Sequence, residues 1–425
     1  MNKTIKSLLP FILCYALLTS VPFANNLPRT VSGTSAHAST ILLTNGLWFD
    51  GHSFKPQTFY SVNGILRQSH SGKIDSSVDL QHRYIIPPFA NAHTHEFVLG
   101  NYRQQIESYL GQGVFYAQNP NSLQKLTDPV RLHLNQPESV DVTFSNGGLT
   151  ATGGHPIQIF DFIAEKGMVP GWTKEAMKNQ AYFVVDTEAD LDAQWELIKS
   201  SKPDFIKTYL EYSEEYETRK ADPKYFGQRG LSPALLIKIV QRAHRDNLRV
   251  AVHVNTAMDF HNALVAKVDE IAHLPLAKIS EADARLAARE KICVVTTTIS
   301  HRKSPAGMDD IHRYNLELLR RQGVRLALGT DNNDHSILDE ADNLYRLKVF
   351  DNLTLLKIWT EDTPAEIFPA RKIGKLKDGY EASLLALDGN PLEEFGNLNR
   401  ISFRLKQGHA VGTDKSQVKP FGAND

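Results

Sequence analysis

Six side chains that can bind a metal or move a proton stand in, or at the ends of, apolar β-rich segments of this chain. The first two are His93 and His95, in the run IIPPFANAHTH. In an extended strand, residues i and i+2 point to the same side, so this pair can hold one cation while Thr94 faces away. The spacing alone is weak evidence, because two solvated or hydrogen-bonded histidines also produce it.

Two more histidines and an aspartate close later segments of the same kind. His253 follows RVAV, His273 follows EIA, and Asp331 follows RLALGT. Taken singly, each histidine also fits a polar residue at the edge of the core, and the aspartate also fits a helix N-cap or a loop carboxylate. If there were no metal site, each of these separate explanations would have to be true at once, for residues that follow one another in this order at the ends of strand-like segments. The set as a whole therefore favours a metal site.

Lys207 lies within the apolar run DFIKTYL, where an unpaired ammonium is costly to bury. The residue also fits a side chain that extends to solvent or pairs with Asp204 or a glutamate. An ammonium has no lone pair to donate, so Lys207 can bind a metal only after modification. Addition of CO2 gives an anionic carbamate, whose two oxygens can bridge two cations.

The elements that must position these residues alternate between strand and helix. Strand-like runs, most of them separated by helical patterns, cover Tyr84–Ala92, Val114–Tyr116, Val140–Ser145, Asp204–Leu210, Arg249–Val254, Glu270–Leu274, Ile292–Ile299 and Arg325–Asp331. Helix starts are predicted at Thr187, Ser232 and Ser280, and a helix end at Gly323. This alternation predicts an α/β protein with a parallel sheet covered by helices. Eight strands over about 270 residues fit a (β/α)8 TIM-like barrel, whose working groups lie at the carboxyl ends of the strands.

Short strands and turns flank the barrel pattern. Residues 39–88 contain strand-like runs, with Asn63-Gly64 as a hairpin turn. Residues 369–425 return to short strands. We expect the two flanks to meet as one small β-sandwich, with the barrel, residues 89–368, between them.

Composition and the N-terminus limit the class of protein. The chain has 425 residues, 41% hydrophobic and 22% charged, with a net charge of −1, so it has no bulk bias toward nucleic acid or anionic membranes. Lys3 and Lys6 precede the short apolar run Leu8–Leu18, which is typical of a secretory signal peptide and too short for a stable membrane span. Residues 1–24 are the expected signal, with a second candidate cleavage point near residue 38. A secreted or periplasmic location follows, and an uncleaved anchor or a disordered arm is the alternative.

Only two cysteines are present, Cys14 and Cys293. The first would leave with the signal. The second lies in an apolar run and is expected to be a small buried hydrophobe, so no disulfide is predicted.

The motifs IIPPFANAHTH, FIK, VHV, AHLP and GTD, in this order, resemble the amidohydrolase superfamily of metal-dependent hydrolases. The tail IGKLKDGYEASLLALDGNPL does so too, and the resemblance runs from about Ile41 to Val411. A lysine on the fourth strand resembles the two-metal branch with imidazolonepropionase-like and prolidase-like members. GLTATGGHP, residues 148–156, is most similar to the prolidase-like group. The chain departs from the family at Asn91 and Ser383, where an aspartate is usual.

The resemblance implies a centre of two divalent ions, with zinc as the default and Mn, Co or Ni satisfying the same ligands. It assigns the first metal to His93, His95 and Asp331, the second to His253 and His273, and the bridge to carboxylated Lys207. A hydroxide bridging the metals would attack an amide-type carbonyl, and Asp331 would pass its proton to the leaving amine. His155, in Gly153-Gly154-His155-Pro156, is a candidate oxyanion or substrate contact, and equally a loop histidine.

The predicted function is hydrolysis of a C–N bond in a small molecule such as a dipeptide, an N-acyl amino acid or a cyclic amide. A hydrolytic deaminase, a lactone or phosphotriester hydrolase, and a non-catalytic secreted metal-binding protein are the alternatives. The loops Tyr212–Arg229 and Ser300–Asp309 are expected to set specificity. The charged residues around the first loop, Glu211 among them, fit a solvated surface or a contact to a charged substrate. A homo-oligomer is an open alternative for the assembly.

Overall fold

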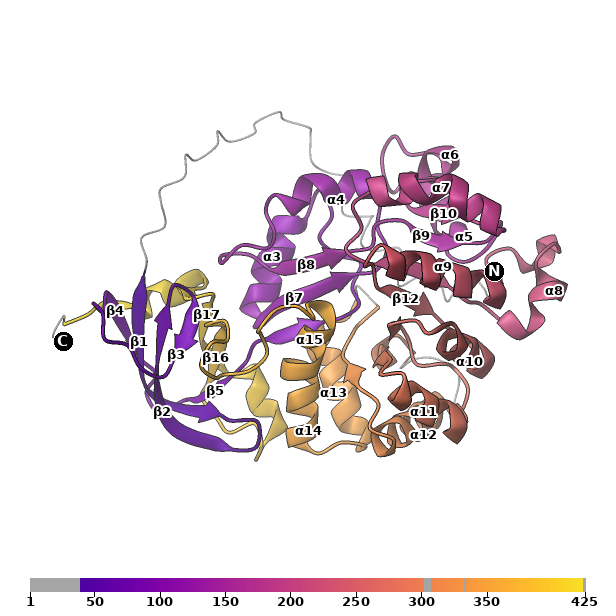
Figure 1. Ribbon diagram of the computed structural model, residues 1–425. Helices are drawn as coiled ribbons and strands as arrows, with labels where there is room; N and C mark the ends of the chain where they lie inside the picture. Colours follow the sequence, from indigo (N-terminus) through magenta and orange to yellow (C-terminus); the bar gives the residue numbers. More distant parts are fainter. Residues whose placement is uncertain (1–38, 302–306, 332–333, 423–425) are drawn as a thin grey trace.

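The computed structural model describes residues 39–301, 307–331 and 334–422 of the chain. The predicted signal, residues 1–38, and Cys14 lie outside these ranges. Within them, an α/β body of parallel strands and surrounding helices lies beside a nine-stranded sheet (Figure 1). A search of the same ranges finds no helix that is both long and apolar enough to cross a membrane.

The nine-stranded sheet is built from both ends of the described chain. Its strands are β1 (Thr40–Phe49), β2 (Phe54–Val62), β3 (Ile65–Arg67), β4 (Ser76–Asp79), β5 (Tyr84–Ile86), β16 (Leu384–Leu387), β17 (Ile401–Lys406), β18 (His409–Ala410) and β19 (Lys419–Pro420). β16 pairs antiparallel with β5, which joins the two flanks. The predicted turn at Asn63-Gly64 is confirmed: Val62 pairs with Ile65, and both turn residues have positive φ, as a two-residue hairpin loop requires.

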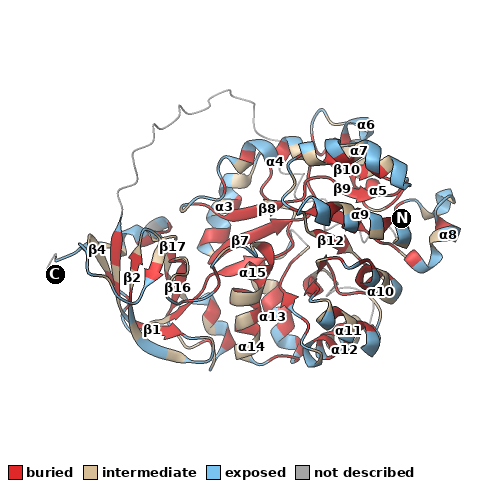
Figure 2. Ribbon diagram, viewed as in Figure 1, coloured by how far each residue is buried: buried red, intermediate tan, exposed pale blue. Residues whose placement is uncertain are grey.

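The remaining strands run parallel in two sheets. The three-stranded sheet contains β6 (Phe89–Asn91), β7 (Val114–Asn119) and β8 (Asp141–Phe144). The seven-stranded sheet, in the order β10-β9-β11-β12-β13-β14-β15, contains β9 (Gly148–Thr150), β10 (Tyr182–Val184), β11 (Ile206–Tyr209), β12 (Val250–His253), β13 (Glu270–Ile271), β14 (Cys293–Val295) and β15 (Leu326–Ala327). Nearly all of these residues are buried, and Cys293 is among them, as predicted (Figure 2).

Backbone hydrogen bonds connect the two parallel sheets at two places. Ala92, just after β6, donates its N–H to the carbonyl of Leu328, just after β15, at 2.7 Å. The N–H of Asp204, just before β11, donates to the carbonyl of Phe144, in β8, at 2.8 Å. Segments that are more than 230 residues apart in the sequence, the ends of β6 and β15, therefore lie side by side.

Helices surround the parallel strands. They are α3 (Tyr102–Gly111), α4 (Gln124–Arg131), α5 (Ile157–Glu165), α6 (Lys174–Met177), α7 (Glu188–Ser200), α8 (Tyr216–Arg219), α9 (Pro233–Arg245), α10 (Ala257–Ala266), α11 (Glu281–Arg289), α12 (Met308–Arg321), α13 (Ile337–Leu347), α14 (Asn352–Lys357) and α15 (Thr363–Ile367). Thr187, Ser232 and Ser280 accept the predicted N-cap hydrogen bonds, and Gly323 follows α12 with positive φ. The outer helix faces are exposed and the inner faces are buried (Figure 2).

Two strands, β9 and β10, are absent from the sequence-based prediction. β9 is only three residues long and lies in the glycine-rich run GLTATGGHP, and β10 is equally short. Each is held by pairing with a distant segment, since Tyr182 of β10 lies opposite Gly148 of β9. Periodicity within a sequence window does not report such pairing.

A buried ion cluster joins the nine-stranded sheet to β8. Lys406, with no exposed side-chain surface, lies 2.6 Å from Asp141 Oδ1, and Arg371 lies 2.7 Å from the other oxygen. Asp141→Ala would leave these cations without their shared carboxylate and is expected to cost about 3–5 kcal/mol of unfolding free energy, measured by urea denaturation. Asp388→Ala is the control, because its exposed pair with Arg83 contributes at most about 1 kcal/mol. Equal losses of unfolding free energy in Asp141→Ala and Asp388→Ala would contradict this prediction.

Candidate metal centre

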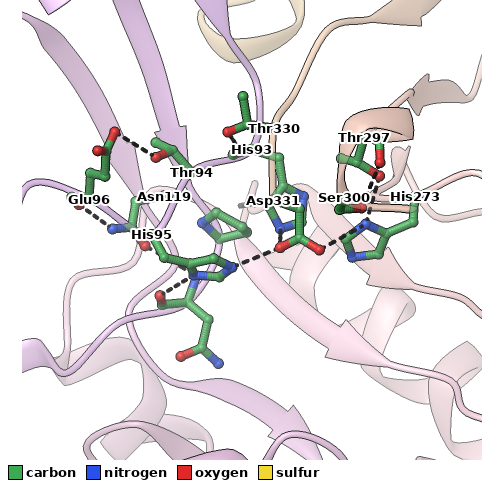
Figure 3. Close-up of polar contacts among 12 residues, drawn as sticks. His93, Thr94, His95, Glu96, Asn119, His273, Thr297, Ser300, Thr330 and Asp331 are labelled. Atoms are coloured by element: carbon green, nitrogen blue, oxygen red, sulfur yellow. Dashed lines mark hydrogen bonds and ion pairs between the residues drawn. The ribbon is translucent and has the colours of Figure 1, made fainter. Parts of the chain in front are cut away.

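The ends of β6 and β15 bring the first three predicted ligands together. The Nε2 atoms of His93 and His95 lie 3.2 and 3.1 Å from Asp331 Oδ1 (Figure 3). The N–H of Asp331 in turn donates to the carbonyl of His93, which fixes one segment against the other. One ligand atom of each of the three residues lies within 4.8 Å of the other two, a separation that one cation can span. Thr94 faces away, as expected, and its hydroxyl donates a hydrogen bond to Glu96 instead.

The other two predicted histidines adjoin this group. The ring of His273 lies 4.6 Å from that of His93 and 4.7 Å from that of His253, between ring centroids. Its Nδ1 atom lies 3.5 Å from Asp331 Oδ2. Four imidazoles and one carboxylate from four separate strand ends thus face one another.

Lys207 lies in β11, which pairs with β12, the strand that ends at His253. Its side chain is 2% exposed, and its Nζ atom has no hydrogen-bond partner among the described residues. Burial lowers the pKa of Lys207 to about 8, so the neutral amine is accessible near physiological pH. A neutral amine is the form that can add CO2, so the chemistry expected of this lysine is open to it.

The protonation states suit metal binding. Burial lowers the pKa of His93 and His253 to about 3, so both rings are neutral and keep a lone pair. Burial alone would raise the pKa of Asp331, but His273 and His93 outweigh it and hold the pKa well below 3.8. Asp331 is therefore a carboxylate, which is the form that binds a cation or accepts a proton.

Contacts outside the cluster fix the histidine rings. His95 Nδ1 donates to the carbonyl of Asn121 at 2.9 Å, and this leaves Nε2 as the nitrogen with a lone pair. His273 Nδ1 lies 3.0 Å from Thr297 Oγ1 (Figure 3). Such partners orient metal-bound imidazoles in proteins. Imidazoles, a carboxylate and a buried lysine whose Nζ has no hydrogen-bond partner among the described residues form a donor set that fits divalent metal.

A pocket opens over the cluster. Its wall combines the predicted ligands with polar and apolar side chains, namely His93, His95, Asn121, His155, Pro156, Ile159, Phe160, Ile163, Lys207, Tyr209, His253, His273 and Asp331. His155 stacks on His253, with ring centroids 4.6 Å apart, and its Nδ1 lies 2.9 Å from Gln158 Nε2. The structure thus places His155 beside the predicted ligands rather than in a solvated loop.

Sequence reasoning missed several residues of the site. Tyr209 stands two positions after Lys207 on the same strand, so the period-two rule could have found it. Glu211, expected in a solvated charge run or at a charged substrate, is buried and lies 3.1 Å from His253 Nε2. Asn121 and Thr297 gave no signal, because their contacts depend on how loops fold. Arg302 and Lys303 of the second predicted specificity loop lie outside the described residues.

Comparisons with known proteins show the family and the fold of the chain. A model of the amidohydrolase family matches residues 84–411. Similar solved structures include the ochratoxinase of A. niger, with 19% identity, 88% of this chain and 95% of that chain covered, and a TM-score of 0.69.

Two peptidase-type structures share the same fold. One is a prolidase complexed with N-methylphosphonate-L-proline, with 20% identity, 88% and 99% coverage and a TM-score of 0.67. The other is a Xaa-Pro dipeptidase with bound methionine, with 18% identity, 88% and 99% coverage and a TM-score of 0.68. No functionally curated protein sequence matches the chain. The predicted superfamily is confirmed, and the chain belongs to the amidohydrolase family.

Proposed function

We propose that this chain is a metal-dependent hydrolase that cleaves the amide-type C–N bond of a small molecule, such as a dipeptide, an N-acyl amino acid or a cyclic amide. The observation that carries the proposal is the contact of one Asp331 oxygen with both His93 and His95, in a pocket that also contains Lys207. Membership of the amidohydrolase family and a fold shared with prolidases support the same reaction class.

The donor set divides into two groups. His93, His95 and Asp331 would hold the first ion, His253 and His273 the second, and Lys207, carboxylated by CO2, would bind both. When bound, two divalent ions, zinc by default, would polarise the substrate carbonyl and lower the pKa of the attacking water.

Asp331 is assigned the proton transfer. As a carboxylate beside the cluster, it can accept the proton of the attacking water and then donate it to the leaving amine. Its contacts with His93 and His95 hold Oδ1 in place for this exchange, and His273 Nδ1 lies 3.5 Å from Oδ2.

His155 is assigned to the substrate carbonyl. Burial lowers the pKa of His155 to about 3, so the ring is neutral. Gln158 Nε2, an amide donor, lies 2.9 Å from Nδ1, which leaves the hydrogen on Nε2 to donate into the pocket.

His155→Ala is expected to lower kcat by about 10²-fold, the effect of removing one donor to a developing oxyanion. Steady-state kinetics with metal content measured in parallel test this, since the metal content should stay at the wild-type value. An unchanged kcat would return His155 to the role of a structural loop residue.

The proposal extends to the closure of the barrel, the β-sandwich and the location of the enzyme. The two parallel sheets would close into one (β/α)8 barrel, which the hydrogen bond from Ala92 to Leu328 supports. Residues 39–88 and 369–425 would form a β-sandwich beside the barrel of residues 89–368. Residues 1–24 would be removed as a signal, giving a secreted or periplasmic enzyme.

The proposed function is tested by incubating purified, metal-loaded protein with a library of dipeptides, N-acyl amino acids and cyclic amides. The expected result is metal-dependent release of a free amine from at least one member. Ammonia release from ring amines, or turnover of lactones or phosphotriesters alone, would favour the alternative hydrolases. Bound metal without any turnover would favour a non-catalytic metal-binding protein.

A further inference from the structure

Glu211 is a buried carboxylate whose contacts converge on one candidate ligand. It follows β11 and is 6% exposed. Its Oε2 atom lies 3.1 Å from His253 Nε2, and its Oε1 atom accepts a hydrogen bond from Asn255 Nδ2 at 2.6 Å. Among the ion pairs within the described ranges, His253 is its only partner. Both oxygens therefore contact side chains of the segment that carries His253.

A second buried carboxylate fixes the backbone around these groups. Asp259, on α10, accepts hydrogen bonds from the N–H groups of Tyr212 and Ser213, at 3.1 and 2.7 Å. It also accepts from the N–H of Asn255 at 3.1 Å. Residues one or two positions after Glu211 and His253 are thus tied to one side chain, which fixes the two backbone segments against each other.

We infer that Glu211 is a positioning residue for His253. Its carboxylate accepts the Nε2–H of the ring, which selects the tautomer with the lone pair on Nδ1. In the described part of the chain, Nδ1 has no hydrogen bond of its own, so it is the nitrogen left to bind a metal. The inference rests on the proposed function, because it matters only if His253 is a ligand. It predicts that the affinity of the centre for its second ion depends on Glu211.

Glu211→Gln tests the inference, because an amide keeps the size of the side chain but has a single acceptor oxygen. That oxygen would have to serve two donors, His253 Nε2–H and Asn255 Nδ2–H. We expect the second equivalent of Zn²⁺ to bind about 10–100-fold more weakly, and the first to be unchanged. Titration of the metal-free protein against a chelating dye measures both.

Glu214→Gln is the matched control. Glu214 lies three residues further on, is exposed, and bonds Thr256 Oγ1 at 2.9 Å. Its removal should leave both Zn²⁺ affinities at the wild-type value. Thermal unfolding of each metal-free variant gives a second readout, since a positioning role leaves the Tm of the metal-free protein unchanged and reduces only the increase that Zn²⁺ produces.

The inference would be overturned if Glu211→Gln bound both ions with wild-type affinity. It would also be overturned if weaker binding came with a lower Tm of the metal-free variant, because the effect would then be structural. Should that variant fail to fold, Asn255→Ala removes the other anchor of the carboxylate, and unchanged Zn²⁺ binding there would overturn it as well. Failure of the proposed function gives a different result, because wild-type protein would then bind no second ion, or would bind its ions and hydrolyse no member of the library.

Discussion

Asp331→Asn is expected to lower kcat/KM by about 10⁴-fold, the upper end of the effect of removing a general acid–base group. The amide cannot take up the proton of the attacking water, and it offers one oxygen where the carboxylate offers two to His93, His95 and His273. Steady-state kinetics of the metal-loaded variant on the best substrate from the library measure the loss. Elemental analysis of the same sample separates lost metal from lost proton transfer.

Asp388→Asn is the matched control for this substitution. Asp388 forms an exposed pair with Arg83 beside the nine-stranded sheet, far along the chain from every predicted ligand. Its kcat/KM should equal that of the wild type. Near-normal turnover by Asp331→Asn would remove this residue from the mechanism.

Lys207→Ala is expected to remove the carbamate that would bind both ions. The variant should lose the second ion, and its activity should fall at least about 10³-fold, because metal catalysis contributes several kcal/mol. The truncated side chain leaves space beside His253 and His273 within the same pocket. Short carboxylic acids such as acetate or propionate should fill that space, supply the missing oxygens and restore part of the activity and of the metal content. Lys238→Ala, at an exposed lysine on α9, is the control.

The same assignment predicts a pH dependence for reloading metal-free wild-type protein. Below pH 8 the ammonium form of Lys207 dominates and cannot add CO2, whereas above it the neutral amine dominates. Metal uptake should therefore require bicarbonate and become faster as pH rises toward about 8. Full turnover with two ions in Lys207→Ala, or reloading that is independent of bicarbonate, would contradict the carbamate.

The predicted ligands could be found from the sequence because simple geometry governs them. Two residues at i and i+2 share one side of a strand, and parallel strands gather their carboxyl ends at one edge. His93, His95, His253 and Asp331 all follow from these two rules. Lys207 could be singled out because burying an unpaired ammonium in an apolar run costs free energy, so such a residue is unusual unless it has a function.

Contacts made between loops could not be predicted in this way. Glu211 was grouped with surface charges because nothing local distinguishes a buried carboxylate from the exposed Glu214 three residues later. The fixing of His273 by Thr297 depends on a turn after β14. The departure at Asn91 has a physical explanation, since its carbonyl oxygen accepts from the N–H groups of His93 and Thr330, a role that does not need a carboxylate.

The central claim is that these side chains hold a pair of divalent ions. The most direct test is elemental analysis of purified protein that has been loaded with Zn²⁺ in the presence of bicarbonate and then freed of loosely bound ions. The account predicts two ions per chain. One tightly held ion per chain, as expected of a deaminase-type centre, or none at all, would contradict it.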